Sequence, residues 1–239
     1  MDEDRIPGFR AKRKMSHQNN IVKKPWGYEY LVYSNEHVGL WFLSINKNQK
    51  TSMHCHPNKT TGLMVLDGEV KVSFLSDSFN LKTKNKLMIR KGLFHSTKAI
   101  SENGASIFEI ETPVDKHDLV RLEDSYGREG KPYEDESFEI PKKTECLWIE
   151  DPPAGEFKIY HFENSSLKIS HIQELEELEN ISEGKNVMFL RGGILSDYDI
   201  HVAGPGDIVS SDVIRKLTNV FQKISIETII LTLEDENEQ

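Results

Sequence analysis

Between Val22 and Thr112 the chain alternates short segments rich in β-branched and aromatic residues with turns, and this pattern most constrains its fold. Each segment is only about five to eight residues long, and none has the 3.6-residue period of a helix. Asp67-Gly68 lies between two of them, and this dipeptide is typical of a two-residue hairpin because glycine accepts a positive φ. Several short strands at this spacing indicate an antiparallel barrel or sandwich. The expected strands are Tyr28–Tyr33, Val38–Ile45, Gly62–Leu66, Val70–Leu75, Lys86–Arg90 and Ser106–Glu111.

Shifts in composition divide the rest of the chain. The first residues are polar, and Lys116–Pro141 is charged and poor in aliphatic residues, which indicates a linker or a surface wrap. A second β-rich stretch contains one expected short helix, Ile172–Ile181, with apolar residues on one side. We expect strands at Asn186–Arg191, Ile208–Ser211 and Ser225–Leu233. The predicted organisation is a tail at 1–21, a barrel at 22–130, a linker at 131–143, a second domain at 144–234 and an acidic tail at 235–239.

Charge and cysteine content exclude several classes of protein. The chain has 30 Lys and Arg against 39 Asp and Glu, a net charge of −9, which argues against a general nucleic-acid or membrane-surface binder. No run approaches the roughly 18 apolar residues of a membrane helix, and the N-terminal residues contain no apolar signal segment. Two cysteines cannot form a disulfide framework, so we expect a cytoplasmic protein.

The most informative motif is Met53-His54-Cys55-His56. On a strand, His54 and His56 point to the same side, where two imidazoles can bind one metal ion. A single H-x-H pair is weak by itself, because most buried histidines are hydrogen-bonded core residues. His95, which follows a glycine-containing turn on another strand, can complete a set of three. Imidazole suits zinc, iron, nickel, cobalt and manganese, so the residues predict one divalent metal ion without naming it.

These motifs resemble those of the cupin superfamily, which are small jelly-roll β-barrels with a metal ion inside. Three further segments resemble, in the same order, the C-terminal cupin domain of type II phosphomannose isomerases. The resemblance covers about half of the chain and implies an all-β cupin barrel that acts on a sugar or sugar phosphate. The matching segments are Lys24–Glu29, Phe108–Thr112 and Asp118–Arg128.

The chain departs from the family pattern at two positions. The family's glutamate ligand, between the histidine pair and the hairpin glycine, corresponds to Thr61, or to Thr60 if the loop shifts by one residue. The proline before the second motif is replaced by Arg90. The resemblance then implies a neutral site of three histidines with open positions for water or substrate. Such a set is known in thiol-type dioxygenases.

Acidic and basic residues near these motifs are candidates for catalysis and substrate binding. Glu109 and Glu111 alternate with apolar residues, and an inward glutamate can act as a general base or replace the missing ligand. We slightly favour the more common arrangement, with both glutamates on the solvated face. Four cations are candidates for an anionic sugar, although a solvated loop lysine and salt-bridged tail arginines are common alternatives. They are Lys59, Arg90, Arg121 and Arg128.

The second half resembles a worn copy of a cupin. Ala203-Gly204-Pro205-Gly206-Asp207 forms a turn like the one before a second cupin motif, and no H-x-H pair is present. We expect a degenerate, metal-free second barrel, and therefore a bicupin; the alternative is a β-rich extension packed on the first barrel. Cupins commonly dimerise by exchanging strands at a barrel edge, so we also expect a homodimer.

Three functions are compatible with these residues. The first is a metal-dependent sugar or sugar-phosphate isomerase or epimerase. The second is a non-catalytic module that binds a sugar or a nucleotide sugar, suggested by the missing glutamate and the worn second half. The third is a dioxygenase that uses ferrous iron at the three histidines.

Overall fold

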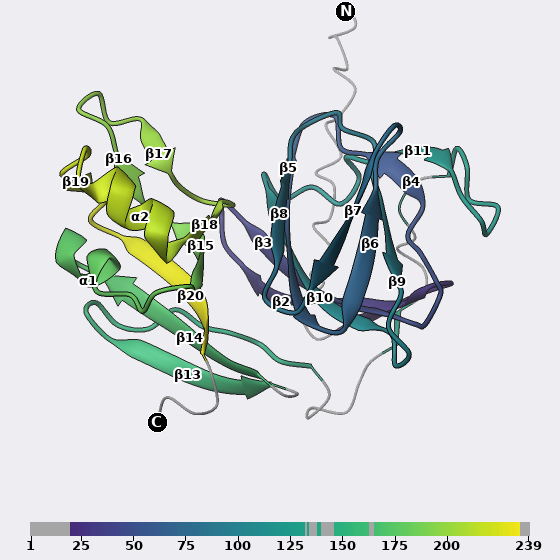
Figure 1. Cartoon of the computed structure of the whole chain (residues 1–239), viewed down its shortest axis with the longest axis horizontal. Helices are drawn as coiled ribbons and strands as arrows, with labels where there is room; N and C mark the ends of the chain where they lie inside the picture. Colours follow the sequence, from purple (N-terminus) through teal and green to yellow (C-terminus); the bar gives the residue numbers. More distant parts are fainter. Residues whose placement is uncertain (1–19, 132, 134–137, 140–145, 163–164, 235–239) are drawn as a thin grey trace, which may run out of the picture.

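The structure, a computed structural model, describes residues 20–131, 133, 138–139, 146–162 and 165–234. Strands dominate this part of the chain, which forms two lobes that lie side by side (Figure 1). Neither helix in these ranges is long and apolar enough to cross a membrane. Almost all of both predicted tails and much of the predicted linker lie outside the described residues. The domain boundaries and the homodimer therefore stay predictions.

The first lobe is a barrel made from two main sheets and one strand pair. A seven-stranded sheet forms one wall, a three-stranded sheet forms the other, and a two-stranded ladder stands at one end. The large sheet, in spatial order, contains β12 (Phe138–Glu139), β1 (Ile21–Lys24), β2 (Gly27–Ser34), β3 (Gly39–Ile45), β10 (Ala105–Thr112), β5 (Thr60–Asp67) and β8 (Lys86–Ile89). The small sheet contains β7 (Ser78–Lys82), β6 (Glu69–Ser73) and β9 (Ser96–Ala99), and the ladder pairs β11 (Val120–Glu123) with β4 (Met53–Cys55).

The second lobe contains a five-stranded sheet, a three-stranded sheet and two helices. The larger sheet, in spatial order, contains β13 (Phe157–Phe162), β14 (Ser165–Ile172), β20 (Thr228–Glu234), β15 (Asn186–Arg191) and β18 (Ile208–Ser210). The smaller contains β17 (His201–Ala203), β16 (Ile194–Leu195) and β19 (Lys223–Ile224). The helices are α1 (Leu175–Glu179) and α2 (Ser211–Thr218).

The central strands of the large sheet are buried on both faces, which explains their nearly continuous apolar sequences. In β3, Trp41 and Leu43 face the barrel interior, whereas Phe42 between them faces the second lobe. Because side chains alternate along a strand, β10 divides in the same way, with Ile107 inside and Phe108 outside. The large sheet therefore separates the barrel interior from a core shared by the two lobes.

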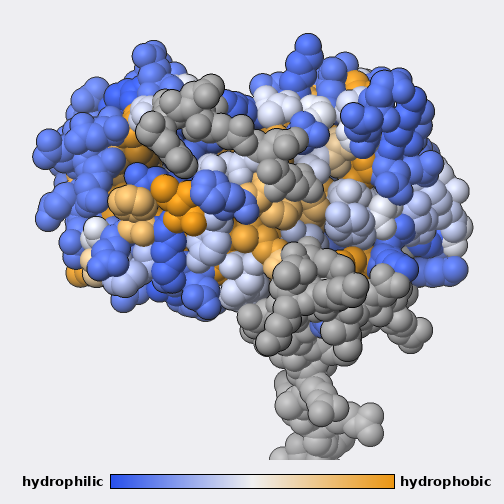
Figure 2. All heavy atoms as spheres, turned by 90° about the horizontal axis from the view of Figure 1, so that it is seen from below, coloured by the Kyte–Doolittle hydropathy of each residue, from blue (hydrophilic) through white to orange (hydrophobic). Residues whose placement is uncertain are grey.

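This shared core joins the lobes into one body. Phe108 and Met64 from the first lobe belong to the same buried cluster as Ile169, Met188 and other apolar residues of the second. Polar contacts also join the two lobes, since the Asn35 side chain donates a hydrogen bond to the Leu190 carbonyl oxygen at 2.9 Å. Seen from below, hydrophilic side chains cover the outer flanks, and hydrophobic ones gather toward the middle (Figure 2). The second lobe thus covers the outer face of the large sheet.

Two local predictions fail for reasons of tertiary structure. Gly68 has the positive φ of 81° that its turn requires, but β5 and β6 do not form a hairpin. They lie in different sheets, because the chain passes at this turn from one wall of the barrel to the other. Helix α2 was not predicted: the strand expected at Ile208–Ser211 ends at Ser210, and the chain turns directly into a helix that buries Ile214.

We expect Gly62→Ala to disturb the packing between the lobes. A Cβ atom at Gly62 would lie 2.8 Å from Ile110 Cγ2 and 2.9 Å from both Ile208 Cδ1 and Met88 Sδ. Overpacking of this kind lowers the free energy of unfolding by about 1–3 kcal/mol, which denaturant titration measures. The exposed Ser76→Ala serves as the control. Equal stability of Gly62→Ala and the wild type would show that the side chains between the lobes are packed less tightly around Gly62 than the structure indicates.

Candidate metal centre and polar cavity

The structure brings the three predicted histidines together at one end of the barrel. His54 lies on β4, His56 follows that strand, and His95 directly precedes β9. The backbones of His54 and His95 are bonded in both directions, with N···O distances of 3.0 and 2.8 Å. All three side chains are buried, and one nitrogen from each ring lies within 4.8 Å of the others. The local pairing of two strands therefore places three imidazoles around one point.

Backbone carbonyl groups determine which nitrogen of each ring carries the proton. Nδ1 of His54 lies 2.8 Å from the Ser52 carbonyl oxygen, and Nδ1 of His95 lies 2.9 Å from that of Leu93. Nδ1 of His56 lies 2.6 Å from the Asp118 carbonyl oxygen. A carbonyl oxygen can only accept, so each Nδ1 must donate, and in a neutral ring Nε2 keeps its lone pair. This outer set of hydrogen bonds is the arrangement that orients metal-binding histidines.

The remaining nitrogens are suited to a metal ion. Nε2 of His56 and of His95 is buried and has no hydrogen-bond partner among the described residues. Burial lowers the pKa of all three histidines, with the nearby Lys59 ammonium contributing, and the pKa of His56 falls to about 2. The rings are therefore neutral at physiological pH, as metal ligands must be. These residues fit a divalent metal ion, and His54, His56 and His95 would hold it.

The structure also places Thr61, which the resemblance aligns with the family's glutamate ligand. Thr61 lies on β5, directly opposite Glu111 in the neighbouring strand. Its hydroxyl is buried and has no hydrogen-bond partner in the described part of the chain. A threonine hydroxyl brings no charge, so a metal ion held by the three neutral histidines would keep its full positive charge for water or a ligand.

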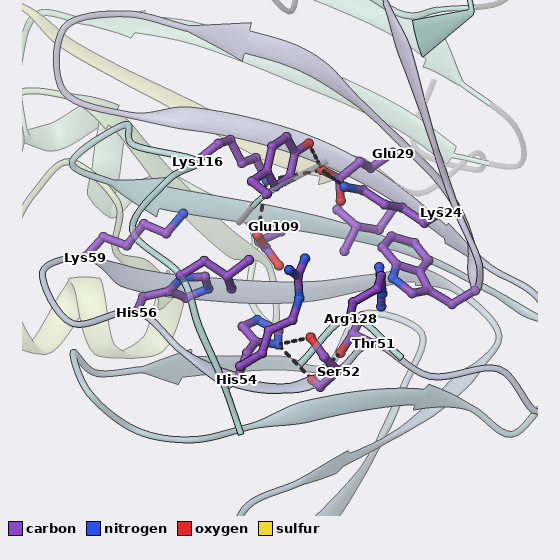
Figure 3. Close-up of a pocket in the computed structure, with 15 residues that line it drawn as sticks. Lys24, Glu29, Thr51, Ser52, His54, His56, Lys59, Glu109, Lys116 and Arg128 are labelled. Atoms are coloured by element: carbon purple, nitrogen blue, oxygen red, sulfur yellow. Dashed lines mark hydrogen bonds and ion pairs between the residues drawn. The ribbon is translucent and has the colours of Figure 1, made fainter. Parts of the chain in front are cut away.

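A group of charged residues forms the opposite wall of the same cavity (Figure 3). Lys116 is its centre, with Nζ 3.6 Å from Glu29, 3.7 Å from Glu109 and 4.0 Å from Glu111. The same ammonium lies 3.8 Å from the centroid of the Trp41 ring. These carboxylates raise the pKa of Lys116 although burial alone would lower it. Lys116 is therefore a permanent cation inside the barrel.

Both glutamates of β10 face the barrel interior, so the preferred expectation that they lie on the solvated face is wrong. They alternate with Phe108 and Ile110, which face the shared core instead of solvent. Because both faces of β10 are buried, the strand has no solvated face for them to occupy. The expectation that Lys59 is a solvated loop residue is also wrong, since its side chain is 1% exposed and pairs with Glu111.

The two glutamates have different surroundings. Glu111 is fully buried, accepts a 3.0 Å hydrogen bond from Trp41 Nε1 and forms an ion pair with Lys59. Glu109 lines the cavity and lies between Lys116 and the histidines (Figure 3). Burial raises the pKa of Glu109, and the neighbouring carboxylates of Glu111 and Glu29 add to this against the opposing effect of Lys116. Glu109 is therefore the carboxylate that can exchange a proton with a ligand.

The predicted substrate-binding cations divide into two groups. Lys59, Arg121 and Arg128 line the cavity. Arg128 also forms two hydrogen bonds with the Asp124 carboxylate, at 3.0 and 2.7 Å, and Arg121 donates to the Lys131 carbonyl oxygen at 2.6 Å. Arg90 is exposed and lies outside the lining, so the structure does not bring it to the site.

Several cavity residues were not predicted. Lys116 lies at the start of a stretch that was interpreted as a linker, and Tyr133 lies within that stretch. Glu29 and Lys24 belong to the first strands of the barrel. The feature of the sequence that could have indicated Glu29 is its position between two tyrosines of a predicted strand. In the structure Tyr133 donates to Glu29, and Lys24 Nζ lies 3.8 Å from the Tyr133 ring centroid. With Lys116 and Lys24 nearby, the pKa of Glu29 falls to about 2 despite burial, which alone would raise it.

A β-barrel with three inward histidines at one end defines a cupin with a metal-type site. A family model described as the C-terminal domain of mannose-6-phosphate isomerase matches residues 11–124, just under half of the chain. The first lobe therefore has a cupin fold and is similar to the C-terminal domain of those isomerases. No curated protein matches the chain.

Solved cupin structures align with part of the chain at low identity. KdgF from Halomonas sp. is 12% identical over 38% of this chain and 84% of its own, with a TM-score of 0.36. An RmlC-like cupin from Shewanella frigidimarina is 15% identical over 42% of this chain and 89% of its own, with a TM-score of 0.38. The Cnp3 cupin domain of Schizosaccharomyces pombe is 11% identical over 36% and 63%, with a TM-score of 0.34.

Proposed function

We propose that the protein is a metal-dependent isomerase or epimerase that acts on a sugar or sugar phosphate. The observation that carries this proposal is one cavity with two kinds of group on its walls. His54 and His56 line one side, with a ring nitrogen of His95 within 4.8 Å of theirs, and Glu109, a cavity carboxylate with a raised pKa, lies near them. The match to an isomerase domain supports the same class.

The charges of the cavity favour an anionic substrate. Although the chain carries a net charge of −9, five cations line the cavity against two lining carboxylates, Glu29 and Glu109. Glu111 and Asp124 pair with two of these cations from outside the lining, which leaves one cation in excess. Burying so many charges costs stability, and a hydrophobic core would be at least as stable. Binding of a polar ligand explains why the barrel contains these buried charges. The lining cations are Lys24, Lys59, Lys116, Arg121 and Arg128.

The reaction follows from the roles of these groups. A bound metal ion would act as a Lewis acid that polarises the carbonyl and hydroxyl oxygens of the sugar. Glu109 takes the proton from the carbon next to the carbonyl group and returns it to the carbonyl carbon, while the hydroxyl proton of the first carbon passes through water to the carbonyl oxygen, so that the carbonyl group moves by one carbon. In an epimerisation, Glu109 takes the proton from one face of the carbon and water delivers a proton to the opposite face. Lys116 stays protonated, so it stabilises the Glu109 carboxylate before the transfer and the negative charge on the sugar oxygens during it. Glu111 stays paired with Lys59 throughout.

Glu109→Gln tests this assignment. Loss of general base catalysis should lower kcat by about 10²–10⁴-fold, while metal content and substrate binding change little. The assay uses the metal-loaded protein with mannose 6-phosphate and related sugars, and elemental analysis gives the metal content. Glu102→Gln, on the exposed surface, is the matched control. Absence of turnover by the wild type with every added metal would contradict the isomerase; turnover lost in His54→Ala would exclude a non-catalytic binding module.

A ferrous dioxygenase is the second candidate, and Thr61 favours it. With threonine at this position, the metal-binding set is three neutral histidines, which leaves several positions open for oxygen and a substrate. Anaerobic loading with ferrous iron, followed by measurement of oxygen uptake, tests this function. Tight zinc binding together with no affinity for iron would exclude it.

A further inference from the structure

The second lobe repeats the strand order of the first. Its larger sheet runs β13-β14-β20-β15-β18, and the first lobe contains β2-β3-β10-β5-β8 in the same spatial order. The small sheets also agree, with β17-β16-β19 matching β7-β6-β9. Along the chain, α1 stands between β14 and β15, at the place where β4 and its histidines stand between β3 and β5. Each strand of the second lobe therefore has a counterpart in the cupin barrel.

Strand register extends this match to single residues. Glu109 lies opposite Trp41 on one neighbouring strand and Leu63 on the other. In the second lobe, Thr232 lies in the same way between Lys168 and Val187. A β-bulge sets the register between the lobes: the pairing of β10 with β5 shifts just before Ile107, and the pairing of β20 with β15 shifts just before Ile230. Thr232, two residues after Ile230, is therefore the counterpart of Glu109, and Lys168 is the counterpart of Trp41.

Two residues further along both strands, Glu234 is the counterpart of Glu111, and Lys185 is the counterpart of Thr61. These second-lobe residues line a groove of about 280 Å³. The groove therefore lies on the same face of its sheet as the polar cavity of the first lobe, where Glu109 is the counterpart that lines the cavity.

A lysine–glutamate ion pair is also present in this groove. Lys185, which is 7% exposed, lies with Nζ 3.4 Å from the Glu234 carboxylate, and Thr232 Oγ1 donates to the same carboxylate at 2.6 Å. In the first lobe, Glu111, the counterpart of Glu234, pairs instead with Lys59, which lies two residues before the counterpart of Lys185. Metal ligands do not recur: the histidine cluster of the first lobe is the candidate metal site found in the described ranges. A ligand in this groove would be bound by polar and apolar contacts alone.

The groove also offers unused groups for a ligand. Lys168 Nζ lies 4.4 Å from the Phe157 ring centroid, and no carboxylate of a described residue lies within ion-pair distance of it. The side-chain hydroxyl of Ser170, on the same strand face, has no hydrogen-bond partner in the described part of the chain. The Phe157 side chain is 57% exposed on the groove wall, so its ring is accessible to a ligand. An aromatic ring beside a mixed set of donors and acceptors suits a molecule with an apolar C–H face and several hydroxyl groups.

We propose that this groove binds a sugar ring without a metal ion. The ring packs on Phe157, while Lys168 and Ser170 donate hydrogen bonds to its hydroxyl groups and Glu234 accepts one. This site is separate from the metal centre and does not depend on the function proposed for it. The second lobe is then a carbohydrate-binding module joined to the first through their shared core.

Methyl NMR of the full chain tests the proposal, because Ile172, Ile181 and Ile230 line the groove. Addition of mannose should shift the signals of these methyl groups, and His54→Ala should leave that response unchanged. Phe157→Ala should weaken binding about three- to tenfold, as loss of an aromatic contact does elsewhere, and Lys168→Met should weaken it as well. Phe79→Ala, which removes an equally exposed ring from β7 of the first lobe, is the control and should have no effect.

Three results would overturn the proposal. The first is no shift of the groove methyl groups at mannose concentrations of tens of millimolar in a protein whose spectrum shows it folded. The second is equal affinity in the wild type and Phe157→Ala. The third is a response to inorganic phosphate but not to mannose, which would make the groove an anion site instead.

Discussion

His54→Ala is expected to abolish stoichiometric metal binding. The substitution removes one of three convergent nitrogens and leaves two neutral ligands, because Thr61 supplies no charge at the family's fourth position. The affinity should fall by at least about 100-fold, the upper end of what losing a supporting group of a ligand costs. Elemental analysis after dialysis and titration calorimetry with zinc or manganese measure the change.

The control for this experiment is His201→Ala, which removes an exposed histidine of the second lobe. It should bind metal like the wild type, while His56→Ala and His95→Ala should behave like His54→Ala. Because the three Nδ1 atoms donate to carbonyl groups of the chain itself, the site is formed before metal arrives. Metal content that stays the same after all three histidine substitutions would show that the ion is bound elsewhere.

Lys59→Met is expected to lower the stability of the barrel strongly. It leaves the Glu111 carboxylate fully buried without its main cation, and breaking one partner of a buried pair costs about 3–5 kcal/mol. Glu111→Gln should cost less, since glutamine still accepts the hydrogen bond from Trp41. Lys59 then keeps the Asp115 carbonyl oxygen, 3.0 Å away, as its acceptor.

The double variant Lys59→Met with Glu111→Gln isolates the interaction. Its loss should be smaller than the sum of the two single losses, because it contains neither buried charge of the pair; contacting residues couple by about 0.5–3 kcal/mol. Denaturant titration of all four proteins gives this coupling energy. As a matched exposed pair, Lys47→Met and Glu102→Gln should each change the stability little. Additive losses in the buried pair would contradict the proposed ion pair.

Local sequence patterns predicted much of the first lobe. The strands expected at Val38–Ile45 and Ser106–Glu111 are β3 and β10 to within a residue at each end. The spacing of His54 and His56 correctly placed both rings on one side of their strand. These predictions succeed because alternation along a strand is a property of the backbone and needs no knowledge of the partner strands.

The orientation of Glu109 and Glu111 could not be obtained in this way. A period of two says that both glutamates share a face, but which face points inward depends on the neighbouring sheets. The second lobe covers the outer face of β10, and this long-range packing makes the interior the only place with partners for the glutamates. The same limit explains Asp67-Gly68, where the positive φ of Gly68 was predicted correctly but the hairpin was not, because the two strands belong to different sheets.

The sequence alone therefore determined a β-barrel with three histidines that can meet inside it, since strand period and motif spacing are local properties. Only the tertiary structure decided what surrounds those histidines. The carbonyl groups of Ser52, Leu93 and Asp118 orient the rings, and Lys116 gathers three carboxylates on the opposite wall. Asp118 and Lys116 approach the site from a segment about sixty residues after His56 in the chain. Such contacts depend on how the strands close into a barrel, and this closure cannot be predicted from the pattern of neighbouring residues in the sequence.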